Sequence, residues 1–122
     1  MLDWKIPLYK VHVDKDDIRG VTNVIKRGTF WAGGPEIEEF EKSLSNYIGS
    51  KYCVSFNSGT SALHASLLSL GISYNDEVLV PSFTFISTVN APLMTNAIPK
   101  FVDIEDSSFG LNPKMIKSSI SK

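Results

Sequence analysis

The tetrapeptide Ser58-Gly59-Thr60-Ser61 is the part of this sequence best suited to bind an anion. It stands between a short apolar segment, residues 52–56, and a longer apolar segment with the composition of a helix. Glycine lets a backbone approach an anion closely, and the hydroxyl groups of Thr60 and Ser61 add hydrogen-bond donors. A helix that begins here also offers unpaired N–H groups and a partial positive charge, which together suit a phosphate. The alternative is that Ser58 or Thr60 only caps the helix.

Other motifs built on glycine or serine fit these residues less well. No Gly-Lys-Ser or Gly-Lys-Thr follows, so the run is not a Walker loop, and the three spaced glycines of a dinucleotide-binding turn are missing. Residues 59–63 resemble a nucleophile elbow only in part, because they lack the second glycine and no acid and histidine pair is evident downstream. Phosphate binding is therefore the chemistry that the tetrapeptide favours.

Two groups of aromatic residues could complete a binding site. Phe83 and Phe85 follow a predicted strand, and either ring could offer a flat face to an aromatic ligand. Phe30 and Trp31 lie in a loop with three glycines and a proline, residues 28–35, where they could form a wall over a ligand. In both cases the alternative is that the aromatic side chains simply pack against the rest of the domain.

The elements that position these residues follow from apolar periodicity and from the residues that begin and end them. Asp14 is a suitable N-cap, Pro35 suits the first position of a helix, and glycines can close the helices that they follow. From residue 52 onward strands and helices alternate, which predicts an α/β fold with a mainly parallel sheet. The expected strands are 52–56, 77–80 and 100–104, and the expected helices are 14–27, 35–48, 60–70 and 84–95, with a last helix after Asn112.

Composition excludes several classes of protein. The chain has 122 residues, of which 43% are hydrophobic and 20% are charged, so it is not a disordered chain. Its formal net charge of −1 provides no broad basic surface for nucleic acid. The single cysteine, Cys53, allows no intrachain disulfide and no zinc site by itself. No apolar run approaches the roughly 20 residues of a membrane span, and the start lacks the features of a signal peptide, so we expect a soluble, cytoplasmic protein.

A further set of motifs extends over nearly the whole chain. It comprises Ile6-Pro7-Leu8, the helix after Asp14, Gly28, Gly33-Gly34-Pro35, Glu39-Phe40-Glu41, Ser58-Gly59-Thr60-Ser61-Ala62-Leu63-His64, Gly71, Asp76-Glu77-Val78, Pro81-Ser82-Phe83-Thr84-Phe85 and Phe101-Val102-Asp103-Ile104. In their types and order these motifs resemble the nucleotide-sugar aminotransferases of the DegT–StrS group, which use pyridoxal 5'-phosphate (PLP).

The resemblance implies a fold and a set of site residues. The fold would be that of aspartate aminotransferase, and this chain would be part of the three-layer α/β/α large domain of a fold type I PLP enzyme. Residues 1–34 would form an N-terminal segment with the substrate loop, and residues 35–122 the N-terminal portion of the truncated PLP-binding domain. The matching positions are Ser58, Gly59, Thr60 and Ser61 for the cofactor phosphate, Phe85 for the PLP ring, and Thr29, Phe30 and Trp31 for the sugar substrate.

The resemblance also implies residues that this chain does not supply. An aminotransferase of this kind needs a lysine that holds PLP and moves a proton, and an acid opposite the pyridine nitrogen. In the family both come from segments beyond residue 122, so we assign no catalytic residue. Ser119-Ile120-Ser121-Lys122 has the family's Ser-x-x-Lys spacing, but it lies too early and lacks the expected flanking residues. The 122-residue chain by itself is therefore expected to be inactive.

The predicted function is that of the N-terminal part of a PLP-dependent aminotransferase. The complete enzyme would transfer an amino group from an amino acid, expected to be glutamate, to a nucleotide-linked keto-sugar for polysaccharide or cell-surface sugar synthesis. The resemblance implies a homodimer, with no nucleic acid or membrane as a partner. Three alternatives stay open: a sugar dehydratase of the same family, a non-catalytic fragment that folds or self-associates, and a small phosphate-binding α/β module.

Overall fold

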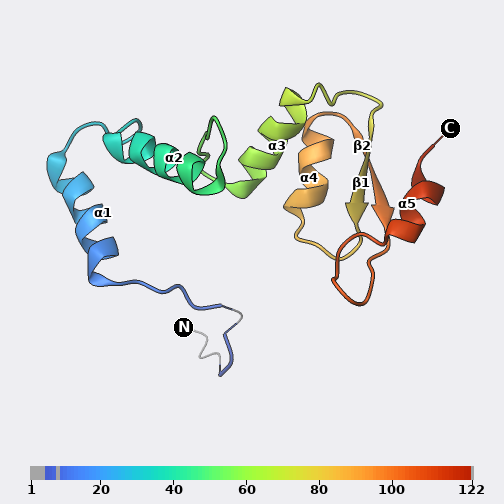
Figure 1. Ribbon diagram of the computed structural model, residues 1–122, viewed down its shortest axis with the longest axis horizontal. Coiled ribbons are helices and arrows are strands. Elements are labelled where there is room, and N and C mark those ends of the chain that lie inside the picture. The colour runs from blue at the N-terminus through green and yellow to red at the C-terminus, as the bar shows by residue number, and fades with distance from the viewer. Residues whose placement is uncertain (1–4, 8, 122) are drawn as a thin grey trace. The chain divides into compact units, whose positions relative to one another are not determined.

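The structure is a computed structural model that describes residues 5–7 and 9–121 (Figure 1). Leu8 and Lys122, which occur in two of the motifs above, lie outside the described residues. The chain divides into two compact units, Met1–Cys53 and Val54–Lys122, and each is described by itself. The expected boundary after residue 34, between the segment with the substrate loop and the PLP-binding domain, stays a prediction.

The first unit contains the helices α1 (Lys15–Arg27) and α2 (Pro35–Ile48). Asp14 caps α1 as predicted, since its carboxylate accepts amides of the first turn and its own amide donates to Asp17. Gly28 ends α1 at a φ of 73°, in the left-handed region that favours glycine. Pro35 stands in the first turn of α2, where its missing N–H has no cost. Both predicted helices are therefore confirmed.

The second unit contains α3 (Gly59–Ser69), β1 (Glu77–Pro81), α4 (Ser87–Met94), β2 (Ile98–Val102) and α5 (Pro113–Ser119). β1 and β2 form a parallel pair, in register from Glu77↔Ile98 to Pro81↔Val102, and α4 connects them. α3 packs against α4, and α5 packs against β2. The parallel pair with helices around it agrees with the predicted α/β class (Figure 1).

The buried core of the second unit lies where α4 and the sheet meet. Val80 of β1 and Val102 of β2 are each 2% exposed, and Ala91 of α4 is 1% exposed. Ala97, just before β2, is 4% exposed. This core holds α4 against the strands, so it also fixes the ends of the loops that follow β1 and β2.

The predicted strand at residues 52–56 is wrong. These residues join no ladder within the described part of the chain, where the sheet consists of β1 and β2. Alternating apolar residues favour an extended backbone, but a strand is stabilised by hydrogen bonds from a neighbouring strand. The local sequence does not specify that neighbour.

Two other predicted elements begin at different residues. α4 starts at Ser87 rather than at residue 84, because residues 82–86 form the loop that leads from β1 into the helix. β2 spans Ile98–Val102 rather than 100–104, because the Asp103 carboxylate accepts the Ile104 amide at 2.9 Å and turns the chain. Ile104 instead forms an isolated antiparallel bridge with Leu111.

Neither a membrane-spanning helix nor a metal-binding cluster occurs among the residues that the structure describes. No described helix is both long and apolar enough to cross a bilayer. No three side chains of His, Cys, Asp or Glu gather in the described ranges in a way that could hold a metal ion.

Candidate functional site

The predicted phosphate loop forms the beginning of α3. Ser58 has an extended backbone and is the N-cap, while Gly59, Thr60 and Ser61 make the first turn. Ser58 Oγ accepts the Ser61 amide at 3.1 Å and lies 2.9 Å from Ser61 Oγ, which donates to Asn57 Oδ1 at 3.2 Å. Ser58 therefore caps the helix, as the alternative interpretation held, and this capping leaves other groups of the turn available.

Two amides at the start of α3 remain available to an anion. The first N–H groups of a helix have no acceptor inside the helix. Ser58 satisfies the amide of Ser61, and within the described ranges the amides of Gly59 and Thr60 donate to no acceptor in the cap or the helix. No acidic residue stands in this first turn, whereas α1 and α2 each carry two. No side chain of the first turn of α3 therefore neutralises the partial positive charge at the start of this helix.

The donor set at this helix start fits a phosphate group such as that of PLP. It consists of the Gly59 and Thr60 amides with the Thr60 hydroxyl, and no carboxylate of the same turn opposes an anion. A Cβ built at Gly59 would meet no atom within 4 Å, so the fold does not require glycine at this position. The absence of a side chain instead keeps the backbone open to close approach.

Phe85 lies in the loop between β1 and α4, and its side chain is 75% exposed. The neighbouring Phe83 ring packs at a tilt against Phe109, with ring centroids 6.1 Å apart. The Thr84 and Thr88 hydroxyl groups lie 2.8 Å apart and link the loop to α4. The sequence left Phe83 and Phe85 as equal candidates for stacking on a ligand, and of the two it is Phe85 that has no ring packed on its face in the described structure.

The start of α3 and the Phe85 loop lie on the same side of the second unit. α3 and α4 run opposite to the strands, so their first turns lie toward the edge where β1 and β2 end (Figure 1). Ligands of open α/β sheets bind at the carboxyl ends of the strands. Ser58–Ser61 and Phe85 are thus brought to one edge of the unit, although the expected strand before Ser58 is not formed.

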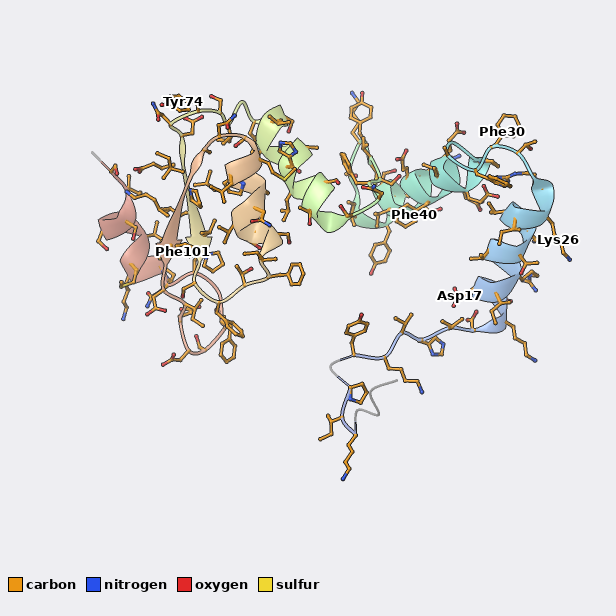
Figure 2. The ribbon with its side chains drawn as sticks, turned by 180° about the vertical axis from the view of Figure 1, so that it is seen from behind. Asp17, Lys26, Phe30, Phe40, Tyr74 and Phe101 are labelled. Carbon is orange, nitrogen blue, oxygen red and sulfur yellow. The ribbon has the colours of Figure 1, made fainter. Side chains whose placement is uncertain are left out.

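Thr29, Phe30 and Trp31, the predicted substrate residues, lie in the first unit, in the loop between α1 and α2. Phe30 and Trp31 are 72% and 68% exposed, and Figure 2 shows Phe30 projecting from this loop. The Trp31 indole N–H donates to Val24 O at 3.2 Å. Both rings are therefore largely exposed in the described part of the chain, and their role in substrate binding stays a prediction.

Sequence reasoning missed the ion pair that holds this loop. Arg27 at the end of α1 binds both carboxylate oxygens of Glu36 in the first turn of α2. The two residues are nine positions apart with a loop between them, so no helical spacing rule connects them. The one signal in the sequence was opposite charge: the last turn of α1 is basic and the first turn of α2 is acidic.

Residues 11–122 match the DegT/DnrJ/EryC1/StrS aminotransferase family. The chain belongs to this family. The match covers more than half of the chain, and it confirms the resemblance that the sequence motifs indicated.

Relatives of known function and solved structures agree with this assignment. The chain is 35% identical over 108 residues to UDP-2-acetamido-2-deoxy-3-oxo-D-glucuronate aminotransferase of Pseudomonas aeruginosa, covering 88% of the chain and 30% of that enzyme. It is 37% identical over 107 residues to 3-oxo-glucose-6-phosphate:glutamate aminotransferase of Bacillus subtilis, covering 88% of the chain and 24% of that enzyme. Spr1654 of Streptococcus pneumoniae, solved in a PLP form and a PMP form, matches with a TM-score of 0.85 and 28% identity, over 97% of the chain and 30% of that structure.

The chain thus spans about a third or less of the relatives that it matches. The structural match shows that the α/β fold is part of the large domain of a fold type I PLP enzyme, as expected. The lysine and the pyridine-pairing acid expected from the family have no counterpart assigned within residues 1–122.

Proposed function

We propose that a protein carrying this chain is a PLP-dependent aminotransferase that moves an amino group from glutamate to a nucleotide-linked keto-sugar. The observation that carries the proposal is the start of α3, where the Gly59 and Thr60 amides are free of acceptors in their own helix and no acidic residue stands beside them. Family membership supports PLP as the ligand of this anion site, bound through its phosphate.

The residues of the second unit would divide the binding of PLP between them. Gly59, Thr60 and Ser61, with Ser58 beside them, would hold the phosphate, and Phe85 would stack on the pyridine ring. When bound, PLP supplies the electron-withdrawing ring that accepts an amino group from one substrate and passes it to the other. The chain's own contribution is to anchor and orient that ring.

The names of the relatives support the proposed substrates. One relative is named for a UDP-linked 3-oxo-sugar, and another for a 3-oxo-sugar phosphate with glutamate as the second substrate. Both sugars carry a keto group and a phosphate, so the proposed acceptor has the same two features. Thr29, Phe30 and Trp31 would contribute the exposed aromatic surface that contacts this acceptor.

The phosphate site can be tested on the chain itself. We propose to titrate the ¹⁵N-labelled chain with 4'-deoxypyridoxine 5'-phosphate, which carries the phosphate but no aldehyde and so cannot react with surface lysines. The Gly59 and Thr60 amide signals are expected to shift, with weak binding because each net hydrogen bond contributes only about 0.5–1.5 kcal/mol. The same compound without phosphate is expected to leave these signals in place.

A glycine pair provides matched variants for this titration. Gly59→Ala adds a methyl group where the backbone would meet the phosphate, yet a Cβ there meets no atom within 4 Å. Gly20→Ala in α1 makes the same change at another open helical position. We expect Gly59→Ala to abolish the shifts and Gly20→Ala to retain them. Equal responses in the two variants, or equal shifts without phosphate, would show that α3 does not hold the cofactor phosphate.

Catalysis is expected to need more than this chain. With PLP and glutamate, the 122-residue chain should form no pyridoxamine phosphate, because the family's lysine and pyridine-pairing acid are not among its assigned residues. Turnover that disappears in Lys122→Ala would contradict this expectation and would make Lys122 the catalytic lysine. Elimination of water from a keto-sugar precursor by a protein carrying this chain would favour the dehydratase alternative.

The cytoplasmic location and the homodimer remain proposals. Large apolar side chains such as Phe101 and Tyr47 are 62% and 88% exposed, so the chain presents apolar surface that a second copy could cover. We therefore expect the isolated chain to self-associate as its concentration rises. Sedimentation velocity would contradict this if the chain stayed monomeric at high concentration.

A further inference from the structure

The loop between α1 and α2 is held by an arginine fork. Arg27 Nη1 and Nη2 bind the two carboxylate oxygens of Glu36, with Nη2 at 3.1 Å from Oε2. The same guanidinium donates from Nε to Thr29 O at 3.0 Å and from Nη2 to Phe30 O at 3.2 Å. One side chain therefore joins the first turn of α2 to the backbone of two predicted substrate residues.

The guanidinium suits this arrangement better than an ammonium group would. Its donors lie in a fixed planar fork, which matches a carboxylate on one side and leaves further N–H groups for carbonyl oxygens. The Arg27 side chain is 27% exposed and that of Glu36 is 50% exposed, so the pair is partly shielded from water. A second ion pair in the same unit, Arg19 with Asp16, is 70% and 75% exposed and touches no loop carbonyl among the described residues.

Two residues of this loop, Phe30 and Gly34, show how closely the ion pair and the backbone fit together. Phe30 has a φ of 54°, in the left-handed region that a non-glycine residue rarely adopts. Gly34 is buried, and a Cβ there would lie 2.6 Å from Arg27 Nη2, 2.6 Å from Glu36 Oε2 and 2.7 Å from Phe30 O. Glycine at residue 34 thus makes room for the ion pair, and the ion pair holds Phe30 in a conformation that the residue would not favour alone.

We propose that Arg27 and Glu36 are positioning residues for the substrate loop, holding residues 29–31 so that the Phe30 and Trp31 rings face the sugar nucleotide. This inference rests on the proposed function, because it takes these rings as the substrate-contacting surface. The ion pair fixes the carbonyl groups of Thr29 and Phe30, and the Trp31 indole then reaches Val24 O.

The test follows Trp31 in the full 122-residue chain. Trp4 is the other tryptophan, so Trp4→Phe leaves Trp31 as a single reporter. In this background the indole N–H signal and the fluorescence of Trp31 are measured in the parent, in Arg27→Lys and in Glu36→Gln. Arg27→Lys keeps the charge but removes the fork, and we expect both variants to move the indole signal toward that of a free indole.

Binding is measured with UDP-N-acetylglucosamine as the probe, through quenching of Trp31 fluorescence. We expect Arg27→Lys and Glu36→Gln to weaken binding of the probe about three- to tenfold. Each variant removes one or two charge-assisted hydrogen bonds that hold the loop, and partial exposure of the ion pair keeps their contribution modest. Arg19→Lys is the matched control, since it alters an exposed ion pair of α1, and it should change neither readout. Far-ultraviolet circular dichroism establishes that each variant retains its helices.

The results separate three proposals: the positioning role of Arg27 and Glu36, the sugar site and the cofactor site. If Arg27→Lys and Glu36→Gln leave the Trp31 signal unchanged, or if Arg19→Lys alters it equally, the positioning role is wrong while the proposed function stands. If the probe does not quench Trp31 in the parent, the loop is not a substrate surface, and the inference falls together with the proposed sugar site. Failure of the phosphate titration at Gly59 would overturn the proposed cofactor site and leave this positioning role intact.

Discussion

Ser82 and Asp103 connect the carboxyl ends of the two parallel strands. Ser82 Oγ donates to Asp103 Oδ1 at 3.3 Å, and the Ser82 amide donates to Val102 O at 2.9 Å. Asp103 also accepts the Ile104 amide through the same carboxylate oxygen and the Asn112 amide through its carbonyl. The loop that carries Phe85 is therefore tied to the residues that follow β2.

Removal of the Ser82 hydroxyl is expected to loosen this connection. Ser82→Ala should lower the free energy of unfolding by about 0.5–1 kcal/mol, a modest loss because the hydrogen bond to the Asp103 carboxylate is exposed and 3.3 Å long. Ser82→Thr keeps the hydroxyl and should retain most of the stability. Urea unfolding of the chain measures both variants, and an equal loss in Ser82→Thr would show that the hydrogen bond to Asp103 contributes nothing.

The N-cap of α3 can be separated from its anion site by two substitutions at one residue. Ser58→Ala removes the acceptor of the Ser61 amide and should lower the free energy of unfolding by about 1 kcal/mol. Ser58→Asp keeps a capping oxygen but adds a negative charge, so it should retain stability and repel phosphate. Thermal unfolding and the titration with 4'-deoxypyridoxine 5'-phosphate test the two effects. Phosphate binding by Ser58→Asp at the parent's strength would place the anion elsewhere.

Val80 is expected to be a sensitive position of the core. It is 2% exposed in β1, so Val80→Ala removes two buried carbons and leaves a cavity, which should cost about 2–3 kcal/mol of stability. Val54→Ala is the matched control, because Val54 is 69% exposed and should lose less than about 0.5 kcal/mol. Similar losses in the two variants would contradict the burial of Val80.

Glu77 is expected to give the second unit a pH-dependent stability. The hydrogen bond from Ser121 and that from Lys100 lower the pKa of Glu77 below its ordinary value of 4.5. A carboxylate with a lowered pKa in the folded state contributes stability above its unfolded pKa and loses it as the pH falls through the folded value. Glu77→Gln should therefore reduce the difference in unfolding free energy between pH 6 and pH 3, measured in urea. An unchanged difference would show that the group does not couple to folding.

The sequence predicted best those features that depend on a few adjacent residues. Asp14 acts as an N-cap, Pro35 stands in a first turn, Gly28 closes a helix, and a last helix follows Asn112, as expected. Each of these roles follows from the backbone chemistry of one residue and its immediate neighbours, so no tertiary information is needed.

Features that depend on a distant partner could not be predicted in this way. Residues 52–56 have the alternation of a strand, but pairing requires a neighbour that local sequence does not name. The side chains of Lys100, Glu77 and Ser121 meet only because β1, β2 and the end of α5 come together. In the candidate site, residue chemistry predicted Ser58–Ser61 and the resemblance added Phe85. The ion pair that holds the substrate loop became evident only in the structure.

The register of the sheet has a consequence for the speed of folding. Each residue of β1 pairs with a residue of β2 that is 21 positions further along the chain, from Glu77↔Ile98 to Pro81↔Val102. The first pair to form closes the connection through α4 and bears the entropy cost of that closure. The other pairs then add contacts without closing a longer loop. A crossover of this length costs less closure entropy than a longer connection between the strands would. We accordingly expect β1, α4 and β2 to assemble early, as the nucleus on which α3 and α5 then dock.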